Sequence, residues 1–245
     1  MNINQFNAIV DQISNAKTKQ ELHEISLAFC QLVNMPYYVI GVFSQDSLYS
    51  PAIHTLNNYP KDWMDLYAEQ NRHKNDPVIA YMLTSHSPVR WDKLLKNERF
   101  QSVEQVLFMK QAIKYGLSNG FSIPIKSISS EFAIFSMAIG EAENAIDIMD
   151  NAQPFAHTFA THLFERFLAI LSQEEIKQFE LTKRERECMF WACEGKTTWE
   201  ISKIIDISER TVLYHLNNST KKLGAINRQH AVAISINRGL IKPNL

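Results

Sequence analysis

Residues 181–223 constrain the fold more than any other stretch, because they carry the start and stop signals of three consecutive short helices. Each predicted helix opens on a favoured N-cap residue, namely Thr182, Thr197 and Ser208. The first two also carry a Glu three residues after the cap, which is the capping-box pattern. Gly195 can end the first helix. We therefore predict a compact all-helical unit here.

The third of these helices has two different faces. Its inward stripe is apolar or small and consists of Val212, Leu216, Ser219 and Leu223. At about 100° per residue, the outward face carries Arg210, Tyr214, Asn217, Asn218 and Lys221. Hydrogen-bond donors and amides without a carboxylate suit base edges and phosphates in a major groove. A polar helix after a short turn indicates a helix-turn-helix, and a small helical bundle with a polar surface is the alternative.

The distribution of charge favours the helix-turn-helix. The whole chain has a net charge of −1, but residues 181–245 carry a net +5 and residues 1–180 a net −6. A basic module attached to an acidic one is typical of a protein that binds a polyanion through the basic part.

The same stretch resembles the C-terminal DNA-binding domain of LuxR-type regulators. The matching motifs are Leu-Thr-x-Arg-Glu, Glu-Gly-Lys-Thr, Glu-Ile-Ser, Ser-Glu-x-Thr-Val and the spacing from His215 to Lys222-Leu223. The resemblance implies binding to double-stranded promoter DNA as a homodimer on two half-sites. The residues expected to contact DNA are Lys196, Thr197, Ser208, Arg210, Thr211, Tyr214, Asn217, Asn218 and Lys221.

The remaining composition narrows the class of protein. The three cysteines, Cys30, Cys188 and Cys193, form no metal-ligand pattern and suggest reduced thiols in the cytoplasm. No apolar run approaches the length of a membrane span, and the N-terminus lacks a secretion signal. Only seven glycines are present, and none forms a phosphate-binding loop. We expect a cytoplasmic protein without a metal or cofactor.

The first 170 residues mix helices and strands. Strands are predicted at 37–43, 49–56, 89–91, 121–126 and 131–140, and a long helix at 144–172. The predicted fold class is α+β, with an N-terminal α-β-α sandwich on a mainly antiparallel five-stranded sheet and a C-terminal all-α four-helix helix-turn-helix domain. The expected domains are 1–170 and 181–245, joined by a polar linker at 171–180.

An aromatic cluster and one acid stand out in the front domain. Tyr59, Trp63 and Tyr67 recur four residues apart, so they share a helical face. Asp76 precedes Pro77 and is a good N-cap for the next helix. From the residues alone, the aromatics could be ordinary core and the acid only a cap.

This region resembles the ligand-binding domain of acyl-homoserine-lactone receptors in the LuxR family. The resemblance rests on the run from residue 58 to 77, on Trp91, and on Gly-Phe-Ser-Ile-Pro-Ile at 120–125. It implies a ligand site formed by Tyr59, Trp63, Tyr67, Asp76, Trp91 and Ser136.

The resemblance also implies a role for each residue. Trp63 would donate to the lactone carbonyl, and Asp76 would accept the amide N–H. Tyr59 and Ser136 would donate to the acyl carbonyl. Tyr67 and Trp91 would line the ring. Strand residues Ile40, Val42, Phe132, Ile134 and Phe135 are candidates for an acyl tunnel.

We therefore predict a quorum-sensing transcription factor, not an enzyme, with an N-acyl-homoserine lactone as its ligand and RNA polymerase as a possible further partner. Three alternatives remain open at this point. The front domain could bind another ligand or none, as in regulators without a partner synthase. An enzyme with a DNA-binding tail would need a catalytic motif, and a response regulator would need alternating βα units; neither is visible.

Overall fold

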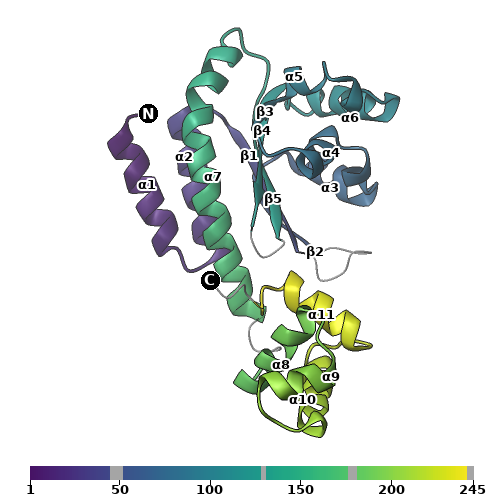
Figure 1. Cartoon of the computed structure of the whole chain (residues 1–245). Helices are drawn as coiled ribbons and strands as arrows, with labels where there is room; N and C mark the ends of the chain where they lie inside the picture. Colours follow the sequence, from purple (N-terminus) through teal and green to yellow (C-terminus); the bar gives the residue numbers. More distant parts are fainter. Residues whose placement is uncertain (45–51, 128–130, 176–180, 242–245) are drawn as a thin grey trace. The chain divides into compact units, whose positions relative to one another are not determined.

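The computed structural model describes residues 1–44, 52–127, 131–175 and 181–241 (Figure 1). The chain divides into two compact units. The first contains most of the chain up to Ile170, and the second contains the helices that follow residue 180. Each unit is described separately below.

The first unit is built on a five-stranded sheet with the strand order β2-β1-β5-β4-β3. The strands are β1 (Tyr37–Ser44), β2 (Ala52–Asn57), β3 (Val89–Arg90), β4 (Asn119–Lys126) and β5 (Phe132–Ile139). Strands β4 and β5 are antiparallel with Ser122 opposite Ser136, and β3 pairs antiparallel with β4. The predicted sheet is confirmed, although residues 49–51 of the second predicted strand lie outside the described residues.

Helices cover both faces of this sheet (Figure 1). One layer consists of α1 (Ile3–Asn15), α2 (Lys19–Val33) and α7 (Ala145–Glu175). The other consists of α3 (Lys61–Glu69), α4 (Pro77–Thr84), α5 (Trp91–Leu94) and α6 (Val103–Ile113), with 3-10 turns at Arg72–Lys74 and Glu98–Phe100. The predicted α-β-α sandwich is therefore confirmed, and the elements that carry most of the predicted ligand residues all lie in the second layer.

The sheet face beneath α2 and α7 is filled by aromatic side chains. Phe29 stacks on Phe159 with ring centroids 4.0 Å apart, and Phe135 packs against Phe159 at 5.7 Å. Tyr38 packs on Phe135, and strand alternation places Ile40 and Val42 on the same face as Tyr38. Ile40, Val42 and Phe135 thus belong to this core. The sequence does not decide which of the candidate tunnel residues face the ligand side, and these three lie on the face opposite Ser122 and Ser136.

Helix α7 continues through Pro154 to Glu175 and ends three residues later than predicted. The first half of the predicted linker, residues 171–175, is therefore helical, and residues 176–180 lie outside the described residues.

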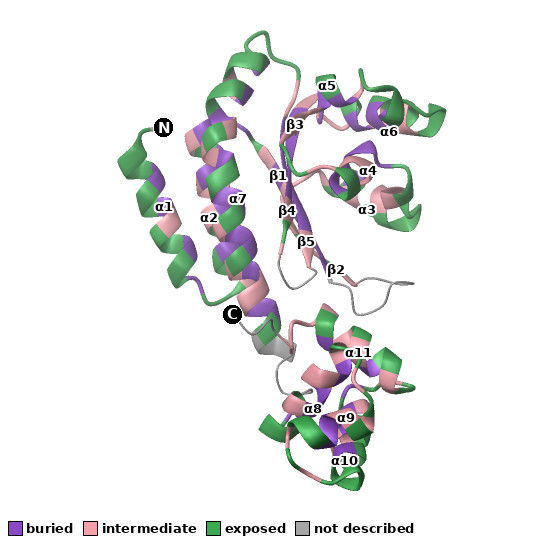
Figure 2. Ribbon diagram, in the orientation of Figure 1, coloured by how far each residue is buried: buried purple, intermediate pink, exposed green. Residues whose placement is uncertain are grey.

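In the second unit, the described residues 181–241 form four helices, as predicted. They are α8 (Lys183–Cys193), α9 (Thr198–Ile204), α10 (Glu209–Lys222) and α11 (Arg228–Asn237). Both predicted capping boxes form, and Ser208 caps α10. The inward stripe of α10 packs into a core with Cys188, Met189 and Ile201. Figure 2 shows buried segments on α8, α9 and α10. Ile204, at the end of α9, is 44% exposed.

Gly120 allows a close approach between the sheet and the second helix layer. A Cβ atom at this position would lie 2.6 Å from the Met137 carbonyl oxygen and 2.8 Å from the Trp91 ring.

We therefore expect Gly120→Ala to destabilise the first unit by about 1–3 kcal/mol, as overpacking does. Denaturant unfolding followed by tryptophan fluorescence measures the change. Gly140→Ala is the matched control, since its nearest neighbour would lie 3.5 Å away. Equal stability of the two variants would contradict the close packing.

Candidate ligand site and nucleic-acid interface

The predicted ligand residues of α3 lie in an aromatic cluster on the second helix layer. Trp63 is only 3% exposed. Its ring centroid lies 6.3 Å from that of Tyr67, 5.2 Å from Phe108 and 5.5 Å from Tyr115. The spacing of four residues on α3 places Trp63 and Tyr67 side by side, and α6 supplies Phe108 from across the layer.

Asp76 joins this cluster to the start of α4. Its Oδ1 accepts from the Val78 backbone N–H at 2.8 Å, so the predicted N-cap is confirmed. Its Oδ2 accepts from the Tyr67 hydroxyl at 3.0 Å. Burial raises the pKa of Asp76 to about 6, although the bonds from Val78 and Tyr67 oppose the rise. A carboxylate oxygen accepts more than one hydrogen bond, so capacity for a further donor remains.

The Tyr59 hydroxyl is buried and has no hydrogen-bond partner among the described residues. Burial and the nearby charge of Asp76 both raise the pKa of Tyr59, so the hydroxyl keeps its proton. A buried polar group without a partner costs about 1–3 kcal/mol. Such a group beside a buried carboxylate indicates a place for a polar molecule that accepts from one residue and donates to the other.

Trp91 and Ser136 lie on the same side of the sheet and are connected by a residue that the sequence did not single out. The Trp91 indole N–H donates to Ser122 Oγ at 2.9 Å, and Ser122 Oγ lies 2.8 Å from Ser136 Oγ. The Trp91 ring packs over Gly120. The structure thus brings together two predicted residues that are 45 positions apart in the chain.

Sequence reasoning also missed three aromatic neighbours of the site. Phe108 and Tyr115 enclose Trp63, and Tyr37 lies edge-on to Tyr59 at 6.3 Å. Arg72 lies over the Trp63 ring at 5.7 Å. Their spacing shows only that Phe108 is in a helix and Tyr37 in a strand, because the sequence does not tell which element packs on which.

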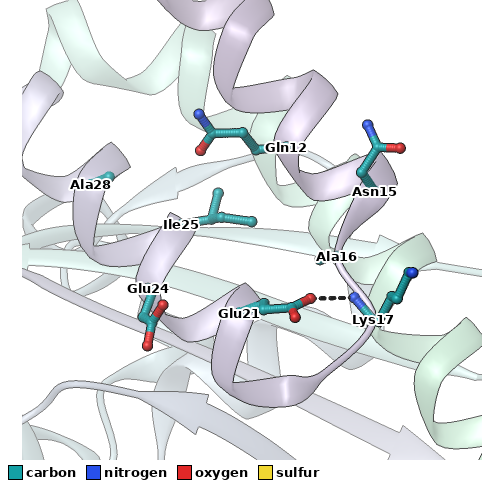
Figure 3. A pocket seen from close by; sticks show the side chains of 8 residues that line it. All are labelled: Gln12, Asn15, Ala16, Lys17, Glu21, Glu24, Ile25 and Ala28. Atoms are coloured by element: carbon teal, nitrogen blue, oxygen red, sulfur yellow. Dashed lines mark hydrogen bonds between the residues drawn. The ribbon is translucent and has the colours of Figure 1, made fainter.

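A groove between α1 and α2 lies in the other helix layer (Figure 3). Apolar Ile25 and Ala28 contribute to it, and Glu21 and Glu24 bring carboxylates. Glu21 accepts from the Lys17 backbone N–H. None of the predicted ligand residues lines this groove.

Among the residues that the structure describes, no group of three or more His, Cys, Asp or Glu side chains could hold a metal ion. Burial raises the pKa of Cys30 to about 12 and that of Cys188 to about 11, so both thiols stay protonated. No described helix is both long enough and apolar enough to cross a bilayer.

The predicted nucleic-acid face of α10 is open to solvent. Arg210, Tyr214 and Asn217 are exposed, as are Thr211 and Lys221, while Asn218 is half-buried. Ser208 is occupied as the cap, since its Oγ accepts from the Thr211 backbone N–H and lies 2.8 Å from the Thr211 hydroxyl. Leu213, which the sequence analysis passed over, is 51% exposed and shares the face of Arg210 and Asn217 by helical spacing.

Two contacts hold the elements of the predicted nucleic-acid interface in place. One is an ion pair and the other is a hydrogen bond. Lys222 Nζ lies 2.7 Å from the Glu185 carboxylate, which is almost fully buried. Burial alone would raise the pKa of Glu185, but the bonds from Lys222 and Thr182 outweigh it and lower the pKa. Arg228 at the start of α11 donates to the Lys196 carbonyl oxygen just before α9. Lys196 and Thr197 are thereby held at the entrance to α9, where Thr197 also bonds to Glu200.

Two family models match the chain. The model of the autoinducer binding domain matches residues 18–167. The model of bacterial regulatory proteins of the luxR family matches residues 180–235. The two matches cover the two units of the structure in sequence order.

Known proteins match over nearly the full length. The transcriptional activator protein LuxR of Aliivibrio fischeri is 33% identical over 239 residues, which is 95% of this chain and 93% of the relative. The crystal structure of SdiA from Escherichia coli superposes with a TM-score of 0.76 at 25% identity, covering 98% of this chain and 99% of SdiA. SdiA in complex with octanoyl-rac-glycerol has the same fold, with a TM-score of 0.74 at 22% identity, 99% of this chain and 97% of that one being covered.

The raised pKa of Asp76 predicts a pH-dependent stability. Its unfolded carboxyl ionises near pH 3.8 and its folded carboxyl near pH 6, so this group destabilises the fold as pH rises through that window. Asp76→Asn keeps an oxygen for the cap but cannot ionise. The free energy of unfolding of the variant minus that of the native protein should therefore rise by about 3 kcal/mol between about pH 4 and pH 7. Denaturant unfolding at several pH values measures the difference, and parallel curves would show that Asp76 titrates normally.

Proposed function

The chain belongs to the luxR family of bacterial regulatory proteins, with an autoinducer-binding domain ahead of a helix-turn-helix, and we propose that its signal is an N-acyl-homoserine lactone. As a member of this family it is a quorum-sensing transcriptional regulator and not an enzyme. The observation that carries the proposal is the pair of Tyr59 and Asp76: one buried donor without a partner beside one buried acceptor. A secondary amide offers the matching acceptor and donor.

Each proposed contact pairs a polar group of the site with one on the ligand. Tyr59 donates its hydroxyl to the acyl carbonyl, and Asp76 accepts the amide N–H. Trp63 donates its indole N–H to the lactone carbonyl, and Ser136 adds a second hydroxyl at the acyl carbonyl. The rings of Tyr67 and Trp91 line the lactone. A site built on such groups rejects ligands that lack the amide, because Tyr59 then stays buried and unpaired.

The proposed ligand also relieves an electrostatic cost. Burial disfavours the ionised form of Asp76, as its pKa of about 6 shows. An amide N–H directed at the carboxylate stabilises that ionised form, so the ligand stabilises the folded first unit at neutral pH. A ligand that binds only the folded state adds about 2.7 kcal/mol at a concentration one hundredfold above its Kd. Folding of the first unit is then the step at which the signal acts.

The proposed output is DNA binding by a homodimer in the cytoplasm. Residues 1–170 bind the signal and dimerise, residues 171–180 link the units, and residues 181–245 bind DNA. Helix α10 enters the major groove of each half-site and α11 adds to the dimer contact. The proposed DNA contacts are Lys196, Thr197, Ser208, Arg210, Thr211, Tyr214, Asn217, Asn218 and Lys221. RNA polymerase is the further partner if the bound dimer activates transcription.

Tyr59→Phe tests the ligand proposal through two effects of opposite sign. Without ligand, the variant should melt at the same temperature as the native protein or higher, because it loses a buried hydroxyl that has no partner. Its affinity for N-octanoyl-homoserine lactone, or for the acyl length that raises the native melting temperature most, should fall up to about tenfold. Melting curves and calorimetric titration give the two quantities.

Tyr81→Phe is the matched control, because the Tyr81 hydroxyl donates to the Ser87 carbonyl oxygen and no ligand role is proposed for it. It should leave lactone affinity unchanged. Ring-opened N-octanoyl-homoserine and octanoyl glycerol serve as comparison ligands. A native protein that responds to neither lactone nor acyl length would contradict the lactone proposal and leave the DNA-binding assignment in place.

Substitutions on α10 separate base contacts from phosphate contacts. On a duplex selected from random sequences by the native protein, Arg210→Ala should cost about 1–3 kcal/mol of binding and relax specificity. Lys221→Ala should weaken all sequences alike and reduce the salt slope by about one. Arg184→Ala removes the same charge from α8, where Arg184 pairs with Glu187, and should have a smaller effect. Equal losses from all three would show that only net charge matters.

A further inference from the structure

Three buried polar side chains form a hydrogen-bonded row on the face of the sheet that carries the proposed ligand site. Trp91 Nε1 lies 2.9 Å from Ser122 Oγ, and Ser122 Oγ lies 2.8 Å from Ser136 Oγ. The two serines are directly opposite each other on β4 and β5. Trp91, Ser122 and Ser136 are 7%, 0% and 4% exposed, so water does not compete for these bonds.

The chemistry of the three groups fixes the direction of the first bond. An indole N–H can only donate, so Ser122 Oγ is the acceptor of the bond from Trp91. Between the two serines either hydroxyl can donate, and within the protein alone each direction leaves one buried proton without an acceptor. A ligand carbonyl at Ser136 distinguishes the two directions. Only the direction from Trp91 through Ser122 and Ser136 to that carbonyl then gives every proton an acceptor.

The direction of this row determines what Ser136 can do. In the direction that a ligand carbonyl favours, the Ser136 oxygen receives the proton of Ser122, and its own proton is left to be donated. No acceptor for that proton is found among the described residues. The row thus ends in a hydroxyl that donates, just as the Tyr59 hydroxyl does.

We propose that Ser122 is a positioning residue that holds Ser136 as a donor to a carbonyl oxygen of the ligand. The inference rests on the proposed function and adds a selectivity rule to it. The site then presents two donating hydroxyls, Tyr59 and Ser136, and one accepting carboxylate, Asp76. It favours an acyl amide, whose carbonyl oxygen can accept two hydrogen bonds, over a ligand that brings a donor to the same place.

A double-mutant cycle tests whether Ser122 acts through Ser136. The dissociation constant of N-octanoyl-homoserine lactone, or of the tightest-binding acyl length, is measured by calorimetry for the native protein, Ser122→Ala, Ser136→Ala and the double variant. Each single substitution should weaken binding about three- to tenfold. The double variant should bind no more weakly than Ser136→Ala, because Ser122 has nothing to position once the Ser136 hydroxyl is gone.

Ser26→Ala is the matched control. Ser26 is an equally buried serine whose hydroxyl donates to the Leu22 carbonyl oxygen at 2.7 Å on α2, in the other helix layer. It should lower the melting temperature without changing the lactone dissociation constant. Trp91→Phe gives an independent arm if Ser122→Ala fails to fold, because it keeps an aromatic ring near Gly120 and removes the donor. Since the Trp91 ring also lines the proposed ligand, this substitution should weaken binding in both backgrounds, and by a smaller factor in the Ser136→Ala background. Equal factors in the two backgrounds would contradict the inference.

Additive losses in the cycle would overturn the inference, since Ser122 would then act on the ligand independently of Ser136. Unchanged affinity in Ser122→Ala would overturn it as well. Both results leave the proposed function intact, because they require that the native protein binds the lactone. A native protein that binds no lactone would overturn the proposed function and this inference together.

Discussion

The proposed receptor site depends on one buried carboxylate, that of Asp76. Asp76 uses one oxygen to cap α4 and the other to accept from Tyr67 on α3, so the same side chain joins two helices and faces the proposed ligand. Its raised pKa shows that the protein's own bonds do not fully replace the lost water. The Tyr59 hydroxyl near it is also buried and lacks a hydrogen-bond acceptor among the described residues. A site that is stable in shape but incomplete in hydrogen bonds suits a receptor whose fold is completed by its signal.

The sheet separates this site from the main core. One face packs aromatics from α2 and α7 against Tyr38 and Phe135 and buries mostly apolar surface. The opposite face carries Gly120, on which the Trp91 ring packs, and the buried hydroxyls of Ser122 and Ser136. In the second unit the same division appears on one helix. The buried stripe of α10 anchors it, and the Glu185–Lys222 pair fixes its end, so the polar face is free to meet DNA.

Local signals in the sequence predicted the elements, and long-range packing decided what the sequence could not. Capping boxes at Thr182 and Thr197 and the stripe from Val212 to Leu223 depend on neighbours within a few residues, and all are confirmed. The face to which an apolar strand residue points depends on what packs above it. The sequence could therefore name Ile40, Val42 and Phe135 only as candidates for an acyl tunnel, and the structure places them on the face beneath α2 and α7. The bond from Trp91 to Ser122 spans 31 positions and joins two unrelated motifs, so no local pattern signals it. The family resemblance named the candidate ligand residues, but whether each contacts a ligand is a question of geometry with the ligand present.

A crystal structure of the protein with an N-acyl-homoserine lactone bound would measure that geometry directly. The account predicts the amide N–H within about 3 Å of the Asp76 carboxylate and the acyl carbonyl oxygen at a similar distance from the Tyr59 hydroxyl. It also predicts that the Ser136 hydroxyl lies within hydrogen-bond distance of a ligand carbonyl. A lactone bound elsewhere, for example in the groove between α1 and α2, with Tyr59 and Asp76 making no contact to it, would contradict the account.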